Sequence, residues 1–166
     1  MNAVSRLEKT LFRLQSQHAC LAWAFERIAD RPGPVIEFGL GLGRTFDHLR
    51  RHLPGRDIYV FDRVNDAYPD CQPDPALLFL GEIEDTLPAL RDRLEGRVVL
   101  ANSDLGSFDR DSNRRVAEMS SRLLPPLMAP GGIVMSDLPL ALSGFETVAL
   151  PPGALEDRYY LYRRTA

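Results

Sequence analysis

Three glycines spaced two residues apart directly follow a short apolar segment that ends in a glutamate. The stretch reads VIEFGLGLGRT and contains Glu37, Gly39, Gly41 and Gly43. Because glycine has no Cβ, such a turn lets a ligand approach the backbone closely. The free amides at the start of a following helix suit an anionic group of a ligand. The turn could therefore hold a phosphate, lie against a nucleotide cofactor that has no phosphate at this point, or only join a strand to a helix.

Two phosphate-binding patterns fit this turn poorly. A dinucleotide fingerprint, G-x-G-x-x-G, would begin at Gly39 and needs a small residue where the chain has Arg44. A P-loop needs four residues between its glycines and then Lys followed by Ser or Thr, whereas this turn has three and continues with Arg44 and Thr45. The turn therefore favours a ligand that carries no phosphate at this point.

Acidic residues end or follow the next predicted strands. Asp62 ends DIYVFD, where a carboxylate can accept hydrogen bonds from both hydroxyls of a ribose, in a dinucleotide or in another nucleoside cofactor. Glu82 and Ile83 come just after the third strand, in FLGEIED. The carboxyl ends of parallel strands meet at one edge of a sheet. We therefore expect these residues to lie in the same crevice as the glycine turn.

Two further aspartates, Asp104 and Asp137, end the fourth and fifth predicted strands, in ANSDLG and MSDLP. Carboxylates at this edge can accept or donate a proton, or hold a divalent cation. We predict that both lie near the reacting groups, and Asp104 is the first candidate for a residue beside the substrate.

The elements that position these residues alternate between apolar runs and amphipathic stretches, which is typical of a doubly wound α/β sheet covered on both faces. Two late apolar runs have no helix between them and predict an antiparallel hairpin at one edge. The predicted helices cover residues 4–28, 44–52, 86–94 and 110–128, and the predicted strands cover residues 35–38, 57–62, 76–80, 97–102, 131–137, 145–150 and 158–164.

Taken in order, these features resemble class I S-adenosylmethionine-dependent methyltransferases. E-x-G-x-G-x-G is similar to their first motif, and LMAPGG resembles the L-x-P-G-G turn before their fifth strand. The resemblance covers about residues 34–164 and implies a Rossmann-like seven-stranded, mostly parallel sheet, S-adenosyl-L-methionine as cofactor, and methyl transfer. It implies an adenine contact for the acid after the third strand. The predicted cofactor-binding residues are Glu37, Gly39, Gly41, Gly43, Arg44, Thr45, Asp62, Glu82 and Ile83.

The methyl acceptor is not identified by this resemblance. NSDL departs from the [DN]-P-P-[FY] motif of enzymes that methylate base amines, and a net charge of −3 disfavours nucleic acid and anionic membranes. Asp104 and Asp137 resemble the metal-holding carboxylates of catechol-type methyltransferases, but Leu138 stands where that family has asparagine, so we assign no metal. We expect a small-molecule acceptor. The alternatives are a nicotinamide-dependent oxidoreductase and a non-catalytic, oligomeric cofactor-binding protein.

Length and composition set the remaining expectations. The 166 residues fit one domain, with a helical segment at 1–30 and a cofactor-binding core at 34–166. Cys20 and Cys71 lie far apart and no apolar stretch is long enough for a membrane span, so we expect a cytoplasmic protein. The apolar stripe from Val4 to Ile28 predicts a helix packed on the sheet, and it also allows a homo-oligomer to form through this helix.

Overall fold

The computed structural model describes residues 3–166. Its α-helices are α1 (Arg6–Ile28), α2 (Arg44–His52), α3 (Ile83–Thr86), α4 (Arg91–Leu94) and α5 (Arg110–Leu123). Its strands are β1 (Val35–Phe38), β2 (Ile58–Asp62), β3 (Leu78–Leu80), β4 (Val98–Ser103), β5 (Met128–Ser136), β6 (Phe145–Thr147) and β7 (Tyr160–Arg164). Short 3-10 turns lie at Pro69–Cys71, Pro75–Leu77, Leu87–Leu90 and Pro125–Leu127.

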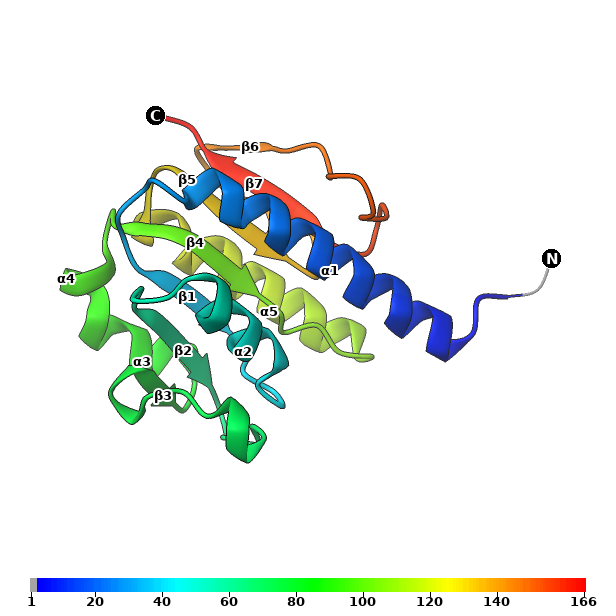
Figure 1. Cartoon of the computed structure of the whole chain (residues 1–166), viewed down its shortest axis with the longest axis horizontal. Helices are drawn as coiled ribbons and strands as arrows, with labels where there is room; N and C mark the ends of the chain where they lie inside the picture. Colours follow the sequence, from blue (N-terminus) through cyan, green and yellow to red (C-terminus); the bar gives the residue numbers. More distant parts are fainter. Residues whose placement is uncertain (1–2) are drawn as a thin grey trace.

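The strands form one seven-stranded sheet in the order β3-β2-β1-β4-β5-β7-β6 (Figure 1). The first five strands are parallel, and β7 pairs antiparallel with both β5 and β6. The predicted mostly parallel sheet with a C-terminal antiparallel hairpin is confirmed. Its order reverses direction between β1 and β4, and ligands of doubly wound sheets bind at this kind of switch point.

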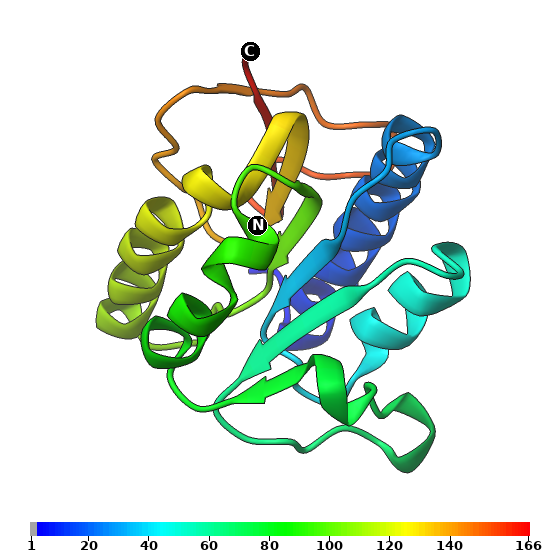
Figure 2. The ribbon, with the colours of Figure 1, turned by 90° about the vertical axis from the view of Figure 1, so that its left-hand side faces the viewer.

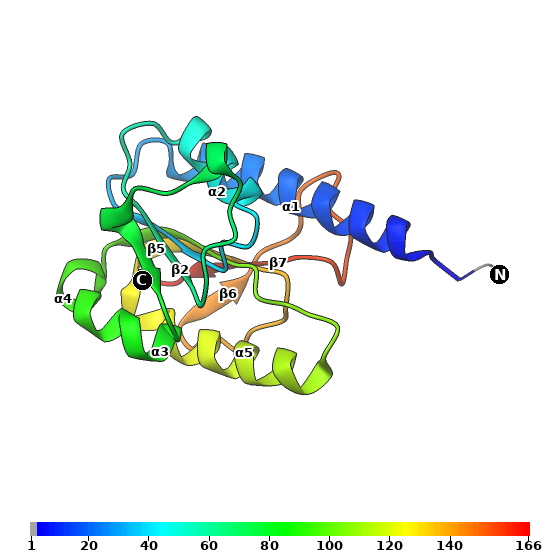
Figure 3. The ribbon, with the colours of Figure 1, turned by 90° about the horizontal axis from the view of Figure 1, so that it is seen from below.

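Helices cover both faces of the sheet, with α1 and α2 on one side and α3, α4 and α5 on the other (Figures 2 and 3). Side chains of β1 alternate between these layers. Val35 packs in the cluster beneath α1 and α2, whereas Ile36 and Phe38 pack in the opposite cluster. Because successive side chains of a strand point to opposite faces, Glu37 faces the α1 side.

Helix α1 has two different halves. A capping box begins it, since the Ser5 hydroxyl accepts from the Glu8 amide while the Glu8 carboxylate accepts from the Ser5 amide. Its C-terminal half packs on the sheet through buried side chains that include Leu21 and Ile28. Its N-terminal half extends past the sheet, on the side to which the arrowheads of β4 and β5 point (Figure 1).

The fifth strand begins at Met128, three residues before its predicted start, and the residues of the predicted turn LMAPGG from Met128 onward belong to it. Three other predicted elements end at least three residues early or are interrupted. The helix predicted to reach Met128 ends at Leu123, because Pro125 and Pro126 have no amide hydrogen for a helical bond. The helix predicted over residues 86–94 is interrupted by a 3-10 turn that contains Pro88, which leaves α3 and α4 as single turns. The strand predicted over residues 145–150 pairs as β6 only up to Thr147.

Candidate active site

A cavity of about 860 Å³ lies at the carboxyl ends of β1, β4 and β5. The N-terminal half of α1 lines one side of it. The turn after β1, the first residues of α2, the loop after β4, and residues 137–138 and 157–158 line the rest. This volume lies in the upper part of the range of about 300–1,000 Å³ that is usual for ligand pockets. The cavity therefore has room for a ligand larger than a single small metabolite.

In the glycine turn, residues 39–43, the space beside Gly39 is occupied by neighbouring protein atoms, whereas the space beside Gly41 is empty. A Cβ on Gly39 would meet the Asp104 carbonyl oxygen at 2.5 Å, so the neighbouring chain requires glycine there. A Cβ on Gly41 would meet no atom within 4 Å, and this residue has a φ of +51°. The space above Gly41 is therefore open to a ligand.

Asp62 holds this turn in place. Its Oδ2 accepts from the amides of Leu40 at 2.7 Å and Gly41 at 3.0 Å, and its Oδ1 accepts from the Arg63 amide at 2.6 Å. An ionised carboxylate has about four acceptor positions. Asp62 therefore shapes the turn and still has capacity for a ligand hydroxyl.

Glu37 lies fully buried beneath the turn, beside its cross-strand neighbour Asn102. Within residues 3–166 neither of its carboxyl oxygens has a hydrogen-bond partner, and the amide nitrogen of the neighbouring Asn102 also lacks one. Burial, with the negative charge of Asp104, raises the pKa of Glu37 well above its usual range. An unpaired buried carboxyl is costly. It is therefore suited to a ligand that brings a donor or a positive charge.

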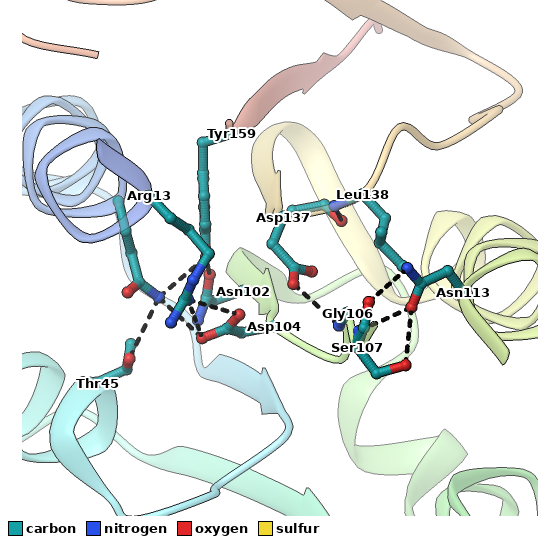
Figure 4. Close-up of polar contacts among 12 residues, drawn as sticks. Arg13, Thr45, Asn102, Asp104, Gly106, Ser107, Asn113, Asp137, Leu138 and Tyr159 are labelled. Atoms are coloured by element: carbon teal, nitrogen blue, oxygen red, sulfur yellow. Dashed lines mark hydrogen bonds and ion pairs between the residues drawn. The ribbon is translucent and has the colours of Figure 1, made fainter. Parts of the chain in front are cut away.

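Asp104 is the centre of a polar network that joins α1 to the sheet (Figure 4). Arg13 pairs with it at 3.3 Å, and the amide of buried Gln17 donates to it at 3.2 Å. The same Gln17 nitrogen lies 3.2 Å from the Thr45 hydroxyl and 3.0 Å from the Tyr159 hydroxyl. One α1 side chain thus contacts the glycine-turn helix, the loop after β4 and the segment before β7.

Tyr159 continues this network into the core. Its hydroxyl donates to the Asn102 side-chain oxygen at 2.7 Å, and burial raises the pKa of Tyr159 well above its ordinary value. The phenol therefore stays protonated and remains a hydrogen-bond donor. Because Asn102 borders Glu37, the network reaches the strand that carries the glycine turn.

Asp137 also lines the cavity, near Asp104. Its Oδ2 accepts from the Gly106 amide at 2.9 Å, and its Oδ1 is buried without a partner among the described residues. Burial, with the charge of Asp104, raises the pKa of Asp137 to about 7. This carboxyl can therefore take up or release a proton near neutral pH.

The predicted site residues all lie near the carboxyl ends of the strands, but they do not share one surface. Six of them line the cavity, and Gly43 begins α2 as its N-cap. Glu37 is covered, and Asp62 contacts the glycine turn but is not part of the cavity lining. Beyond the cavity lining, the Glu82 side chain is 64% exposed and 4.0 Å from Arg63, and Ile83 is buried at the start of α3. The six cavity residues are Gly39, Gly41, Arg44, Thr45, Asp104 and Asp137.

No metal site is evident in residues 3–166, where no three His, Cys, Asp or Glu side chains are grouped to hold an ion. The same residues contain no helix that is long and apolar enough to cross a membrane.

Sequence reasoning missed Arg13, Gln17 and Tyr159. Gln17 adjoins the apolar stripe of α1, and polar residues near such a stripe are usually solvated. The signal that could have identified it is its register, since Arg13 and Gln17 lie four residues apart on one helix face.

The strand order, the glycine turn and the cavity at the strand ends together define the class I methyltransferase fold. Residues 4–164 match the family described as S-adenosyl-L-methionine methyltransferase, and the chain belongs to this family. It is an enzyme that uses S-adenosyl-L-methionine as its cofactor. No curated protein matches the sequence.

Solved structures agree with this assignment. A crystal structure of an S-adenosyl-L-methionine methyltransferase from Silicibacter pomeroyi DSS-3 matches with a TM-score of 0.92 and 44% identity, over 96% of this chain and 98% of that chain. The antibiotic-resistance methyltransferase Kmr matches with a TM-score of 0.55 and 13% identity, over 88% of this chain and 91% of that chain. A putative ribosomal RNA methyltransferase from Plasmodium falciparum matches with a TM-score of 0.53 and 11% identity, over 98% of this chain and 97% of that chain. The last two similarities concern the fold alone.

Proposed function

We propose that the enzyme methylates a small molecule and binds S-adenosyl-L-methionine across the glycine turn. The unpaired Glu37 carboxyl beneath the turn carries the cofactor part of this proposal, because a cationic amino group could offset its burial. The open position at Gly41 leaves room for the amino acid part of the cofactor. Asp62 would take the ribose, and Glu82 with Ile83 the adenine. When bound, S-adenosyl-L-methionine supplies an electrophilic methyl group.

The two aspartates of the cavity floor would act on the acceptor. Asp104 is held by Arg13 and Gln17, which fixes the direction of its carboxylate. Asp137, with a pKa of about 7, can accept a proton from an acceptor hydroxyl or amine at neutral pH. The N-terminal half of α1, which lines one side of the cavity, would restrict the access of water to this floor.

A small acceptor fits the cavity better than a polymer does. The cavity lies between α1 and the loop after β4, and it is bounded on several sides. The net charge of −3 disfavours long-range attraction of RNA or DNA. No observation favours a nicotinamide cofactor or a protein without catalysis.

Titration with S-adenosylhomocysteine tests the cofactor site. We expect the unmutated protein to bind it, and Gly41→Ala to bind it at least about ten-fold more weakly because the methyl group enters the ligand space. Gly55→Ala is a matched control, since Gly55 also has a positive φ, of +74°, and no atom within 4 Å of a Cβ, but it lies outside the cavity lining. Equal weakening by both variants, or no binding by the unmutated protein, would contradict the assignment.

We also propose that the enzyme forms a homo-oligomer through α1. Three large apolar side chains on its N-terminal half are exposed, namely Leu7 at 79%, Leu11 at 48% and Leu14 at 36%. Exposed apolar stripes of this kind favour contact between helices. Light scattering should show a species larger than one chain, which Leu7→Glu with Leu11→Glu converts to monomer. A monomer at all concentrations would contradict this proposal.

A cytoplasmic location is proposed as well. Cys20 and Cys71 are both buried and unpaired. Burial raises the pKa of Cys20 to about 12, so this thiol stays protonated and unreactive. Two thiols in this state fit a reducing compartment. Localisation of a tagged chain by fractionation would test it.

A further inference from the structure

Cationic side chains gather along the rim of the cavity although the chain as a whole is negatively charged. Arg6, Lys9 and Arg13 come from α1, where spacings of three and four residues place them on neighbouring positions of one helix face. Arg44 comes from the start of α2 and Arg158 from the segment before β7. Three parts of the chain that are far apart in sequence thus bring positive charge to one opening.

Most of this rim charge has no protein partner. Of the five side chains, Arg13 alone pairs with a carboxylate in the part of the chain that the structure describes, namely with Asp104 at 3.3 Å. Arg6 and Lys9 are exposed at the N-terminal end of α1. An unpaired group of arginine and lysine side chains beside a cavity attracts an anion and can donate several charge-assisted hydrogen bonds to it.

An aromatic ring stands beside these charges. Phe108 lines the cavity from the loop after β4, and it is 97% exposed. The Arg6 guanidinium lies over this ring, 5.7 Å from its centroid. A ring that is almost fully exposed offers a flat apolar surface for a planar ligand, next to a cation that can bind the ligand's charge.

The floor has the opposite charge. Asp104 and Asp137 lie there, and Asp137 also accepts from the Gly106 amide (Figure 4). An anionic group would be repelled by these carboxylates and attracted to the rim. A ligand with one anionic end therefore has a single favourable orientation, with that end toward α1 and its other end toward the two aspartates.

We propose that the methyl acceptor is a small planar molecule with a carboxylate or phosphate group, which Arg6 and Lys9 bind at the rim beside Phe108. This inference rests on the proposed function, because it assumes that the cavity floor is the place of methyl transfer. The rim then selects the acceptor by its charge, and the orientation brings its nucleophilic end to Asp104 and Asp137.

Calorimetric titration of protein saturated with S-adenosylhomocysteine tests this inference with three probes that share one ring. Benzoate and phenyl phosphate carry the two anionic groups, and benzamide is the neutral analogue. We expect at least one anion to bind about ten-fold more tightly than benzamide. The tighter of the two anions identifies the group that the rim prefers. Failure of both anions to bind, or binding of benzamide with equal affinity, would overturn the inference.

A double variant, Arg6→Gln with Lys9→Gln, tests whether the cationic rim causes the preference for anions over benzamide. We expect it to weaken anion binding about ten-fold and to leave the affinity for S-adenosylhomocysteine unchanged, since neither side chain belongs to the glycine turn. Arg27→Gln, at the other end of α1 and outside the cavity lining, should bind the anions like the unmutated protein. Unchanged anion binding by the double variant would overturn the inference. Loss of S-adenosylhomocysteine binding by the unmutated protein would instead overturn the proposed function.

Discussion

Replacing Asp137 by asparagine should remove a pH-dependent loss of stability. Burial and the charge of Asp104 raise the pKa of Asp137 from 3.8 to about 7. Between these values the folded chain keeps a proton that the unfolded chain releases, so the free energy of unfolding falls as the pH rises through this window. Between about pH 5 and about pH 8, this shift in the pKa of Asp137 lowers the free energy of unfolding by about 3 kcal/mol. Asparagine is never charged and escapes this loss.

Urea unfolding at several pH values measures the effect. The free energy of unfolding of Asp137→Asn, minus that of the unmutated protein, should increase by about 3 kcal/mol from about pH 5 to about pH 8. Asp92→Asn is the control, because Asp92 is an exposed aspartate on α4, and it should follow the unmutated protein throughout. If the difference between Asp137→Asn and the unmutated protein stays constant over this range, the reasoning about the cavity floor is refuted.

Three further variants test the rest of the site. Gln17→Leu should lower the free energy of unfolding by about 1–3 kcal/mol in urea, because it leaves buried polar partners unsatisfied, and unchanged stability would contradict that role. Glu37→Gln should have the same melting temperature as the unmutated protein at neutral pH, since burial already favours the uncharged carboxyl. In calorimetry it should bind S-adenosylhomocysteine more weakly than the unmutated protein does, and equal affinity would exclude Glu37 from the cofactor site. Burial and the nearby His52 and His18 lower the pKa of His48, so the contribution of His48 to stability should fall as the pH drops below about 6.5. In thermal melts, the melting temperature of His48→Gln minus that of the unmutated protein should therefore be higher at pH 5 than at pH 7.5, and an equal difference at both pH values would contradict this role.

Much of the sheet could be predicted because its signals are local. VIEF, DIYVFD and RVVLAN are apolar runs bounded by charged or turn residues, and each became a central strand. Element ends were less predictable where local signals competed. The amphipathic pattern of α5 continues past Leu123, but Pro125 and Pro126 end the helix and start the path into β5.

The candidate site was predictable only where its residues are close in sequence. The glycine turn is one contiguous motif, so its strand-to-helix geometry follows from its composition. The contact of Gln17 with Tyr159 joins residues 142 positions apart, and no local pattern indicates such a contact. The course of α1 along the cavity depends on how its buried half packs on the sheet. The same packing brings the charged side chains of Arg6 and Lys9 to the rim of the cavity.

The position of S-adenosylhomocysteine in a crystal of this protein is the most direct test of the central claim, that the glycine turn holds the cofactor with its reacting end toward the two aspartates. We predict electron density for the amino acid end over Gly41 and Glu37, for the ribose at Asp62, and for the sulfur facing Asp104. Density at another place, or a sulfur directed away from the cavity, would contradict the account.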